Sequence, residues 1–277
     1  MSGERRAMER SSWAHRGIDL ERPSVARVYD YFLGGAHNFA VDRQLADAID
    51  GLAPAFGDTM RANRAFLRRA VRFLVGAGIT QFLDIGSGIP TVGNVHDIAR
   101  RADPTARVVY VDIDPIAVSH SRVILAGDQR TAVIEADARD TDRILEAPET
   151  RQLLDLARPV AVLLAGVIDY VPEAHDPVGI VGRLRDAVCP GSHVVLVNAT
   201  DENQPPEVVE AQKLLGRTGT PIHLRSRAQL LEQFTGWTLV PPGLVFLPLW
   251  RPDSPLDRVP NPERFGALAG IGRKDGP

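Results

Sequence analysis

The sequence predicts an α/β fold: a doubly wound, mostly parallel seven-stranded sheet with one antiparallel edge strand, preceded by an N-terminal helical cap. From residue 81 onward, apolar β-branched runs alternate with stretches of helical periodicity, which is the pattern of a parallel sheet covered by helices. Three of these runs, at residues 81–85, 107–112 and 132–137, end in an acid or run into a glycine turn. Such tips are typical of parallel strands whose carboxyl ends hold a ligand.

The chain begins with a region that differs in character from this core. Residues 1–22 mix both charge signs with little periodicity, so we expect a tail that is disordered in part. Residues 23–76 are expected to form the helical cap. Its first helix must stop at Gly34, and further helices are predicted at residues 42–49 and 63–75.

Residues 77–277 are expected to form the core, so that cap and core together make a single domain over 23–277. A buried fourth strand is predicted at residues 160–168 and a fifth at 193–197. Residues 199–225 are then expected to form a polar insert. Because this insert follows a strand tip, we expect it to lie over the edge of the sheet that binds the ligand. Helices are predicted at 143–156, 177–188 and 226–234, and a closing hairpin with a reversed final strand at 237–240 and 244–249.

The turn after the first strand reads D-I-G-S-G-I-P from Asp84. Gly86 and Gly88 permit positive φ and let a ligand lie against bare backbone. Asp84 faces the ligand and is able to bind a cation or an amino group. At the next two strand tips, Asp112 suits a grip on ribose hydroxyls and Asp137 suits an adenine amine. Together these positions predict a pocket for an adenosine-bearing ligand.

The same turn distinguishes between adenosine ligands. The dinucleotide fingerprint requires a third glycine where Thr91 stands, and Asp84 interrupts the strand before the turn, which speaks against a nicotinamide-dependent reductase. S-adenosylmethionine carries a sulfonium and an α-ammonium and has no pyrophosphate. The pattern resembles the class I S-adenosylmethionine-dependent methyltransferases, which are Rossmann-like, although Pro90 stands where their third glycine usually lies.

The cap shows a second and more specific resemblance. The run R-V-Y-D-Y-F-L-G-G-A-H-N-F-A-V-D-R, from Arg27 to Arg43, is similar to the opening of the S-adenosyl methyltransferase family, long catalogued as a domain of unknown function. The likeness extends from about Ser24 to Arg251. It implies a Rossmann-like fold with S-adenosyl-L-methionine as cofactor, and it leaves the methyl acceptor open.

The cofactor-binding residues are predicted from these patterns. The segment from Tyr29 to Asp42 is expected to close over the cofactor as a lid, because its glycine pair supplies a hinge. The predicted residues are Tyr31, Gly34, Asn38, Arg64, Asp84, Gly86, Ser87, Gly88, Asp112, Ile113, Asp137, Ala138 and Gly166.

The catalytic candidates come from the lid and from two strand tips. Methyl transfer is an in-line displacement that needs alignment of the acceptor and removal of its proton, and needs no metal ion. His37 is a natural base near neutral pH, and Asp169, Tyr170 and Asn198 end the fourth and fifth strands, where they are expected to face the methyl group.

Composition removes several other classes of protein. The net charge of −3 provides no electrostatic attraction to nucleic acid or to an anionic membrane. A single cysteine, Cys189, excludes an internal disulfide and a cysteine-built zinc site, and suits a reducing cytoplasm. The longest apolar run, residues 160–168, is shorter than the roughly 20 residues that a membrane helix needs.

The sequence therefore predicts a cytoplasmic S-adenosylmethionine-dependent methyltransferase that acts on an unidentified small-molecule acceptor, without a metal ion and without a nucleic-acid or membrane partner. An alternative is a catalytically idle protein that binds S-adenosylmethionine or S-adenosylhomocysteine as a sensor or partner protein. An enzyme and such a sensor would have the same cofactor-binding residues. The oligomeric state stays open.

Overall fold

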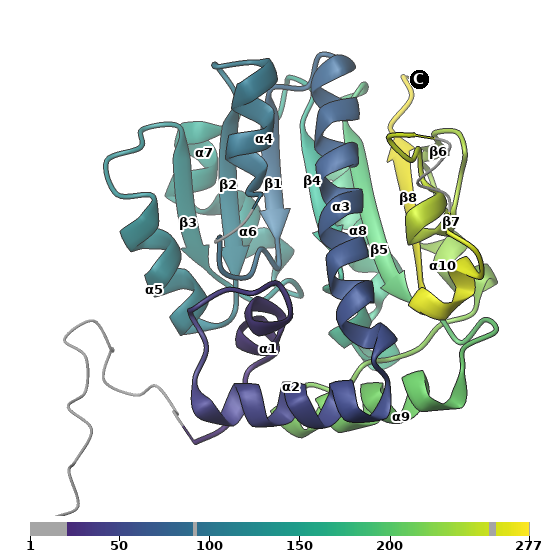
Figure 1. Cartoon of the computed structure of the whole chain (residues 1–277). Helices are drawn as coiled ribbons and strands as arrows, with labels where there is room; N and C mark the ends of the chain where they lie inside the picture. The colour runs from purple at the N-terminus through teal and green to yellow at the C-terminus, as the bar shows by residue number, and fades with distance from the viewer. Residues whose placement is uncertain (1–20, 91–92, 255–258, 277) are drawn as a thin grey trace, which may run out of the picture.

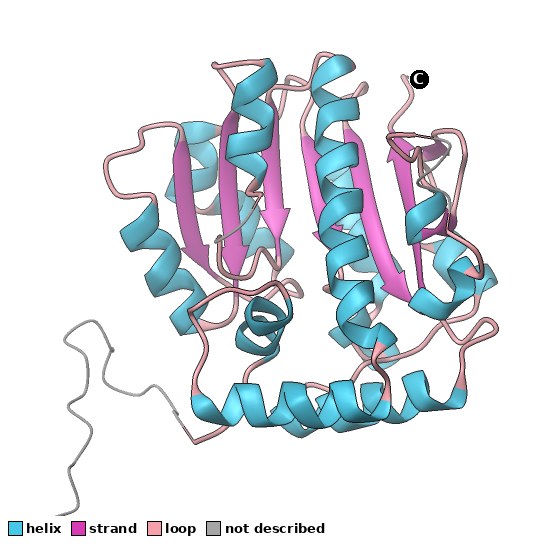
Figure 2. Cartoon of the chain, viewed as in Figure 1, coloured by secondary structure: helices cyan, strands magenta, loops and turns pink. Residues whose placement is uncertain are grey.

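The computed structural model describes residues 21–90, 93–254 and 259–276. Apart from its last two residues, the tail expected at 1–22 lies outside the described residues. Within them the chain forms a sheet with helices on both faces and a helical layer across the ends of the strands (Figures 1 and 2).

The sheet has eight strands in the order β3-β2-β1-β4-β5-β8-β6, with β7 also paired to β8. The first five strands are parallel, and β8 runs antiparallel to β5, β6 and β7. The predicted fold class, a doubly wound and mostly parallel sheet with an antiparallel region at one edge, is confirmed. The strands are β1 (Gln81–Ile85), β2 (Arg107–Asp112), β3 (Thr131–Glu135), β4 (Ala161–Ala165), β5 (His193–Ala199), β6 (Thr238–Leu239), β7 (Val245–Phe246) and β8 (Ala267–Arg273).

The end of the sheet differs from the expectation of seven strands closed by a hairpin. Both predicted hairpin strands are present in shortened form, but each pairs with β8. This last strand was missed because Gly270 and Gly272 weaken its strand pattern. A Cβ atom at Gly272 would lie 2.7 Å from Trp237 Cβ, and one at Gly270 would lie 3.0 Å from Phe234 Cζ. The glycines are there because aromatic side chains pack directly on the strand.

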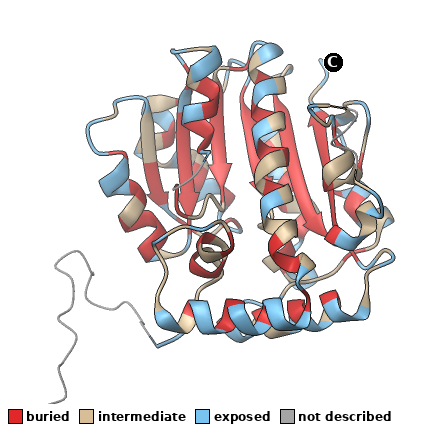
Figure 3. Cartoon of the chain, in the orientation of Figure 1, coloured by how far each residue is buried: buried red, intermediate tan, exposed pale blue. Residues whose placement is uncertain are grey.

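Both faces of the sheet are buried, which explains why its strands read as continuous apolar runs (Figure 3). Alternate residues serve opposite faces: Phe82 packs with α3 and α4, and Leu83 packs with α6 and α8. The helices are α1 (Val25–Phe32), α2 (Ala40–Leu52), α3 (Ala55–Gly76), α4 (Val95–Ala102), α5 (Pro115–Ile124), α6 (Thr141–Glu146), α7 (Pro148–Leu153), α8 (Pro177–Ala187), α9 (Pro206–Leu215) and α10 (Arg227–Glu232).

A separate apolar cluster holds the helical layer at the carboxyl ends of the strands. Val28 of α1, Ile49 of α2 and Phe56 of α3 pack there with Val208 and Leu215 of α9. Figure 1 shows α2 and α9 lying across the tips of the strands. Helix α9 belongs to the insert after β5, so the insert and the N-terminal cap share one core. For this reason we propose that the chain from residue 23 onward is one domain.

One further property of the helices bears on partners. No helix in the described ranges combines the length and the apolar character that crossing a bilayer requires.

Candidate functional site

A cavity of about 780 Å³ lies between the carboxyl ends of the parallel strands and the helical layer. Its lining extends from Asp137, just after β3, to Ala267 at the start of β8. The strand order reverses between β1 and β4, which both contribute to it, so the cavity is at the topological switch point where open α/β sheets bind ligands. Its volume is within the range of about 300–1,000 Å³ that is usual for small-molecule sites.

The turn after β1 lines the cavity with backbone. Gly86 has φ 73° and Gly88 has φ 65°, both in the left-handed region that favours glycine. A Cβ atom at Gly86 would lie 2.6 Å from Val167 Cγ2, whereas one at Gly88 would meet nothing within 4 Å. Gly86 therefore allows the β1 and β4 turns to approach each other, and Gly88, with Ser87, leaves the peptide open to the cavity.

Asp112 fixes the loop that faces this turn. One carboxylate oxygen accepts from the Gly88 amide at 2.7 Å and the other from the Asp114 amide at 2.8 Å. Burial raises the pKa of Asp112 to about 6, and these two amides act against that rise. Each oxygen keeps a further lone pair. The carboxylate is thus held in place with capacity left for hydroxyl donors.

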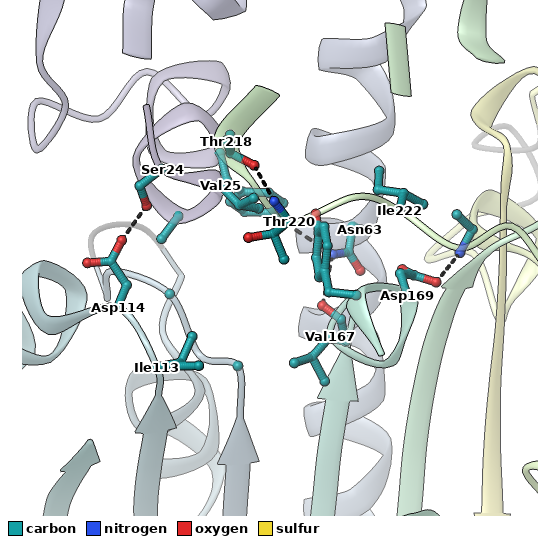
Figure 4. A pocket seen from close by; sticks show the side chains of 18 of the residues that line it. Ser24, Val25, Asn63, Ile113, Asp114, Val167, Asp169, Thr218, Thr220 and Ile222 are labelled. Atoms are coloured by element: carbon teal, nitrogen blue, oxygen red, sulfur yellow. Dashed lines mark hydrogen bonds between the residues drawn. The ribbon is translucent and has the colours of Figure 1, made fainter. Parts of the chain in front are cut away.

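The next residues along β2 and β3 supply an apolar face and a second acid. Ile113 is 62% exposed and lines the cavity, so its side chain is available to a flat ligand (Figure 4). Asp137 accepts from Arg139 Nε at 2.9 Å to each oxygen, and this arginine lowers the pKa of Asp137. Ala138 lies beside it in the cavity wall.

A polar group from α1, α3 and β1 occupies the middle of the cavity. Burial raises the pKa of Asp84 to about 7, the nearby charge of Arg64 opposes the rise, and that of Asp112 adds to it. The Arg64 guanidinium lies over the Tyr29 ring, with Cζ 5.6 Å from the ring centroid. Asn63 Nδ2 donates to Tyr29 Oη at 3.2 Å and to the Ala165 carbonyl at 3.5 Å.

This group leaves two buried polar atoms for a ligand. Among the described residues, Asn63 Oδ1 and Arg64 Nε are buried side-chain atoms without a hydrogen-bond partner. Both residues line the cavity. An amide oxygen accepts and a guanidinium nitrogen donates, so the pair suits a ligand that carries both an ammonium and a carboxylate.

The tip of β4 leads into the other end of the cavity. Gly166 has φ 83° and its amide donates to the Val197 carbonyl at 3.0 Å. Beyond it, Asp169 Oδ1 accepts from the Ala199 amide at 2.7 Å (Figure 4). Burial raises the pKa of Asp169 to about 7, and both this amide and the charge of Arg225 oppose the rise. Burial also raises the pKa of Tyr170, so its phenol keeps its proton.

The structure does not bring the predicted lid residues to the cavity. The cavity lining includes none of Tyr31, Gly34, His37 and Asn38. Instead, the Asp30 carboxylate accepts from the His37 amide at 2.8 Å and from Asn38 Nδ2 at 3.0 Å, and Tyr31 Oη donates to Asp47 at 2.9 Å. These groups hold the turn between α1 and α2 together.

His37 and Asn198 have other neighbours as well. The His37 ring packs edge-on against His120, with 4.6 Å between ring centroids. Asn198 Nδ2 donates to Gln233 Oε1 at 3.1 Å, whereas its neighbour Ala199 lines the cavity. The segment that covers the cavity near Ile113 is residues 22–27, where the Ser24 hydroxyl donates to Asp114 (Figure 4).

Most of the residues that line the far end of the cavity, beneath β4 and β5, were not named from the sequence. These lining residues include Phe56, Thr59, Met60, Val208, Gln212, Ile222, His223, Phe265 and Gly266, together with Thr218 and Thr220, which lie beside Val25 (Figure 4). One signal was available: Asn63 interrupts the apolar stripe of α3, which runs through residues 56, 60, 63, 67, 70 and 74. A polar residue on the buried face of a helix has a partner or lines a site. The 218–223 segment carries no comparable signal.

Comparison with known families agrees with this geometry. Residues 11–275 match the family model described as S-adenosyl methyltransferase. The chain belongs to the S-adenosyl methyltransferase family. Its cofactor is S-adenosyl-L-methionine, as predicted. The cavity fits this cofactor, because Asn63 Oδ1 and Arg64 Nε offer the unpartnered acceptor and donor that its amino-acid end requires.

Solved structures support the family assignment. The chain is 42% identical to a candidate methyltransferase from Thermobifida fusca YX, with a TM-score of 0.88 over 96% of this chain and 100% of that one. It is 41% identical to a DUF574 family protein from Streptomyces avermitilis MA-4680, with a TM-score of 0.88 over 92% and 99%.

A more remote likeness concerns the fold alone. The N-methyltransferase NodS from Bradyrhizobium japonicum WM9, in complex with S-adenosyl-L-homocysteine, is 13% identical, with a TM-score of 0.50 over 90% of this chain and 100% of that one. Comparison with curated proteins gives no match.

Proposed function

We propose that this member of the S-adenosyl methyltransferase family transfers a methyl group to a small-molecule acceptor. The observation that carries the proposal is the placement of a buried carboxylate, Asp169, in the same cavity as the glycine turn, at its opposite end. When bound, the cofactor supplies an electrophilic methyl group on a sulfonium, which an acceptor oxygen or nitrogen takes with loss of a proton.

The residues proposed to hold the cofactor follow the cavity wall from β3 to β4. The Asp112 carboxylate binds the ribose hydroxyls, Ile113 packs on the adenine, and Asp137 with Ala138 lies at the adenine edge. The turn from Gly86 to Gly88 lines the path between. Asn63, Arg64 and Asp84 bind the amino-acid end, and Gly166 bounds the cavity beside them.

Asp169 is the proposed base. A general base works best when its pKa is near the working pH, and burial places the pKa of Asp169 at about 7. Tyr170 keeps its proton and so orients an acceptor by hydrogen bonding. We leave His37 out of this role, because its ring lies against His120 and not in the cavity lining.

We further propose that the acceptor is a small molecule of the cytoplasm and that neither nucleic acid nor membrane is a partner. The net charge of −3 offers no electrostatic attraction to either polyanion. The cavity is also of the size expected for a small ligand.

Incubation with methyl-labelled S-adenosylmethionine and fractionated small-molecule extract tests the proposal. We expect label in a low-molecular-mass product with the wild-type protein and a loss of at least about 100-fold with Asp169→Asn. Normal S-adenosylhomocysteine binding without any labelled product would instead support the catalytically idle sensor.

A further inference from the structure

The end of the cavity beneath β4 and β5 contains two buried polar atoms for which the described residues provide no partner. They are Oε1 of Gln212, on α9, and Nε2 of His223, in the segment that follows α9. Both residues line the cavity, and Gln212 is only 6% exposed. A buried acceptor left unpaired costs about 1–3 kcal/mol, so a ligand that donates to it recovers that energy.

These two atoms are held in place by the surrounding chain. The His223 amide donates to the Asp169 carbonyl at 2.7 Å. Two residues on, Arg225 donates to the Ile168 carbonyl at 2.9 Å and to the Val171 carbonyl at 2.6 Å, which fixes this segment to the turn that carries Asp169. Gln212 stands on α9, whose apolar face is buried against α2. The unpartnered atoms are therefore part of a built site.

The surface around them is apolar. Phe56 and Met60 of α3, Val208 of α9, Ile222 and Phe265 line this end of the cavity. Aromatic and thioether side chains offer broad, polarizable contact to a flat apolar ligand.

Charge limits the ligand further. Asp169 is the charged side chain that lines the buried part of this end. The arginines around the cavity are engaged, peripheral or at the cofactor end. Arg27 pairs with Asp42 at 2.7 Å and Arg139 pairs with Asp137, whereas Arg22 is exposed and lies against Gly219. Arg64 lies over Tyr29 in the group proposed for the cofactor, and Arg225 donates to Glu173 and to the Ile168 and Val171 carbonyls. A carboxylate or phosphate bound here would lie beside Asp169, and the one charge of the buried Arg225 already serves Asp169 and Glu173, so a second anion is unfavourable.

We propose that this end binds the methyl acceptor as a neutral, flat, largely apolar molecule whose hydroxyl or N–H group donates a hydrogen bond to Gln212 Oε1 and also pairs with His223 Nε2, which donates or accepts according to the tautomer of its ring. The identification of this molecule as the acceptor rests on the proposed function, whereas the site and its preference for a neutral donor rest on the contacts above. Methyl transfer then takes place at a second group of the acceptor, which forms the new bond to the methyl carbon as the bond to the sulfonium sulfur breaks, and which gives its proton to Asp169 in the same wall.

Three matched probes test the preference: 2-naphthol, which donates a hydrogen bond; 2-methoxynaphthalene, which cannot; and 2-naphthoate, which is anionic. Their dissociation constants are measured by ligand-observed NMR titration of the full chain saturated with S-adenosylhomocysteine. We expect 2-naphthol to bind about tenfold more tightly than either of the others, as the gain of a buried hydrogen bond implies.

The variant Gln212→Leu tests whether the preference for 2-naphthol arises at Gln212. It should reduce the preference for 2-naphthol over 2-methoxynaphthalene to about twofold, while thermal unfolding stays unchanged or improves because an unsatisfied polar group has gone. The matched control is Lys213→Leu, at an exposed neighbouring position of α9, which should keep the wild-type preference. His223→Leu provides an independent second variant and should also reduce the preference.

The inference is overturned if 2-naphthoate binds as tightly as 2-naphthol, if none of the three probes binds, or if both cavity variants keep the wild-type preference. Its failure is distinguishable from that of the proposed function. If 2-naphthol is preferred but no labelled methyl product forms, the proposed methyltransferase function is contradicted and the proposed binding site is supported. If the labelled product carries a carboxylate or phosphate group, the preference for a neutral acceptor is contradicted and the methyltransferase function is supported.

Discussion

The two ends of the cavity differ in whether their polar groups have hydrogen-bond partners. Beneath β2 and β3 the acidic side chains are paired. Beneath β4 and β5 two buried polar atoms have no partner in the described part of the chain. Asp112 accepts from two backbone amides and Asp137 is paired with Arg139. Gln212 Oε1 and His223 Nε2 are without partners there. The first end is ordered before a ligand arrives, and the second depends on a ligand to satisfy it. The contrast indicates that the part of the cavity proposed for adenosine is ordered in advance, whereas the far end, like Asn63 and Arg64 in the middle of the cavity, depends on a ligand for its partners.

The largest expected effect separates the two ends by function. Asp169→Asn keeps the oxygen that accepts from the Ala199 amide and removes the base, so methyl transfer should fall by about 100- to 10,000-fold. The affinity for S-adenosylhomocysteine, measured by calorimetry, should stay within about twofold. A comparable loss of cofactor affinity would mean that Asp169 belongs to the cofactor end.

The second effect concerns the cofactor end. Asp112→Ala should weaken S-adenosylhomocysteine binding by roughly 2–4 kcal/mol, since hydrogen bonds to a carboxylate contribute about 1.5–3 kcal/mol each. The fold should lose about 1–2 kcal/mol, because the Gly88 and Asp114 amides lose their acceptor. Asp112→Asn, which keeps acceptor oxygen, is the milder control. Unchanged calorimetric affinity in the alanine variant would remove Asp112 from the site.

The third effect is on stability against pH. Burial raises the pKa of Asp84 and of Asp169 to about 7, from 3.8. The folded protein therefore binds more protons than the unfolded chain between about pH 4 and pH 7, and its free energy of unfolding falls as the pH rises through that window. Such a rise in pKa corresponds to about 4 kcal/mol for each group over the whole window.

Urea denaturation at pH 5 and pH 8 measures this dependence. Asp169→Asn should be more stable than the wild type at pH 8 and should lose that advantage at pH 5. A wild-type protein that is equally stable at both pH values would show that these carboxylates are better solvated than their burial indicates.

The smallest effect is expected in the turn between α1 and α2. Asn38 Nδ2 donates to Asp30 and to the Gly35 carbonyl, outside the cavity lining. Asn38→Ala should therefore change S-adenosylhomocysteine affinity by less than about twofold, while costing about 1 kcal/mol in stability. Hydrogen exchange of residues 29–42 should be equally slow with and without ligand. A strong gain in protection on binding would restore the lid interpretation of this segment.

The same contrast between the two ends explains what the sequence could predict. Each part of the cofactor end is local: Gly86 and Gly88 follow β1 directly, and Asp112 ends β2. Once parallel strands are recognised, their tips must meet at one edge. The fold class and these strand tips follow from short stretches of sequence.

The insert at residues 199–225 was expected over the ligand edge, but the individual residues of the far end could not be predicted in this way, because they are distant in the chain. Phe56 of α3, Gln212 of α9 and Phe265 meet only after the insert packs on the cap. The prediction of a lid at Tyr29 to Asp42 depends on a related point, and hydrogen exchange is its test. Polar groups near Gly34 suggested a ligand contact, but the carboxylate of Asp30 accepts hydrogen bonds from the His37 amide and from Asn38 Nδ2.

A crystal structure with S-adenosylhomocysteine bound gives the most direct test of a cavity divided into a cofactor end and an acceptor end. We expect the ribose hydroxyls on Asp112, the adenine against Ile113 and the amino-acid end at Asn63 and Arg64. The space beside Gln212 should then be left free. Adenosine bound instead beside Gln212 and His223, with no contact to Asp112, would contradict this division of the cavity.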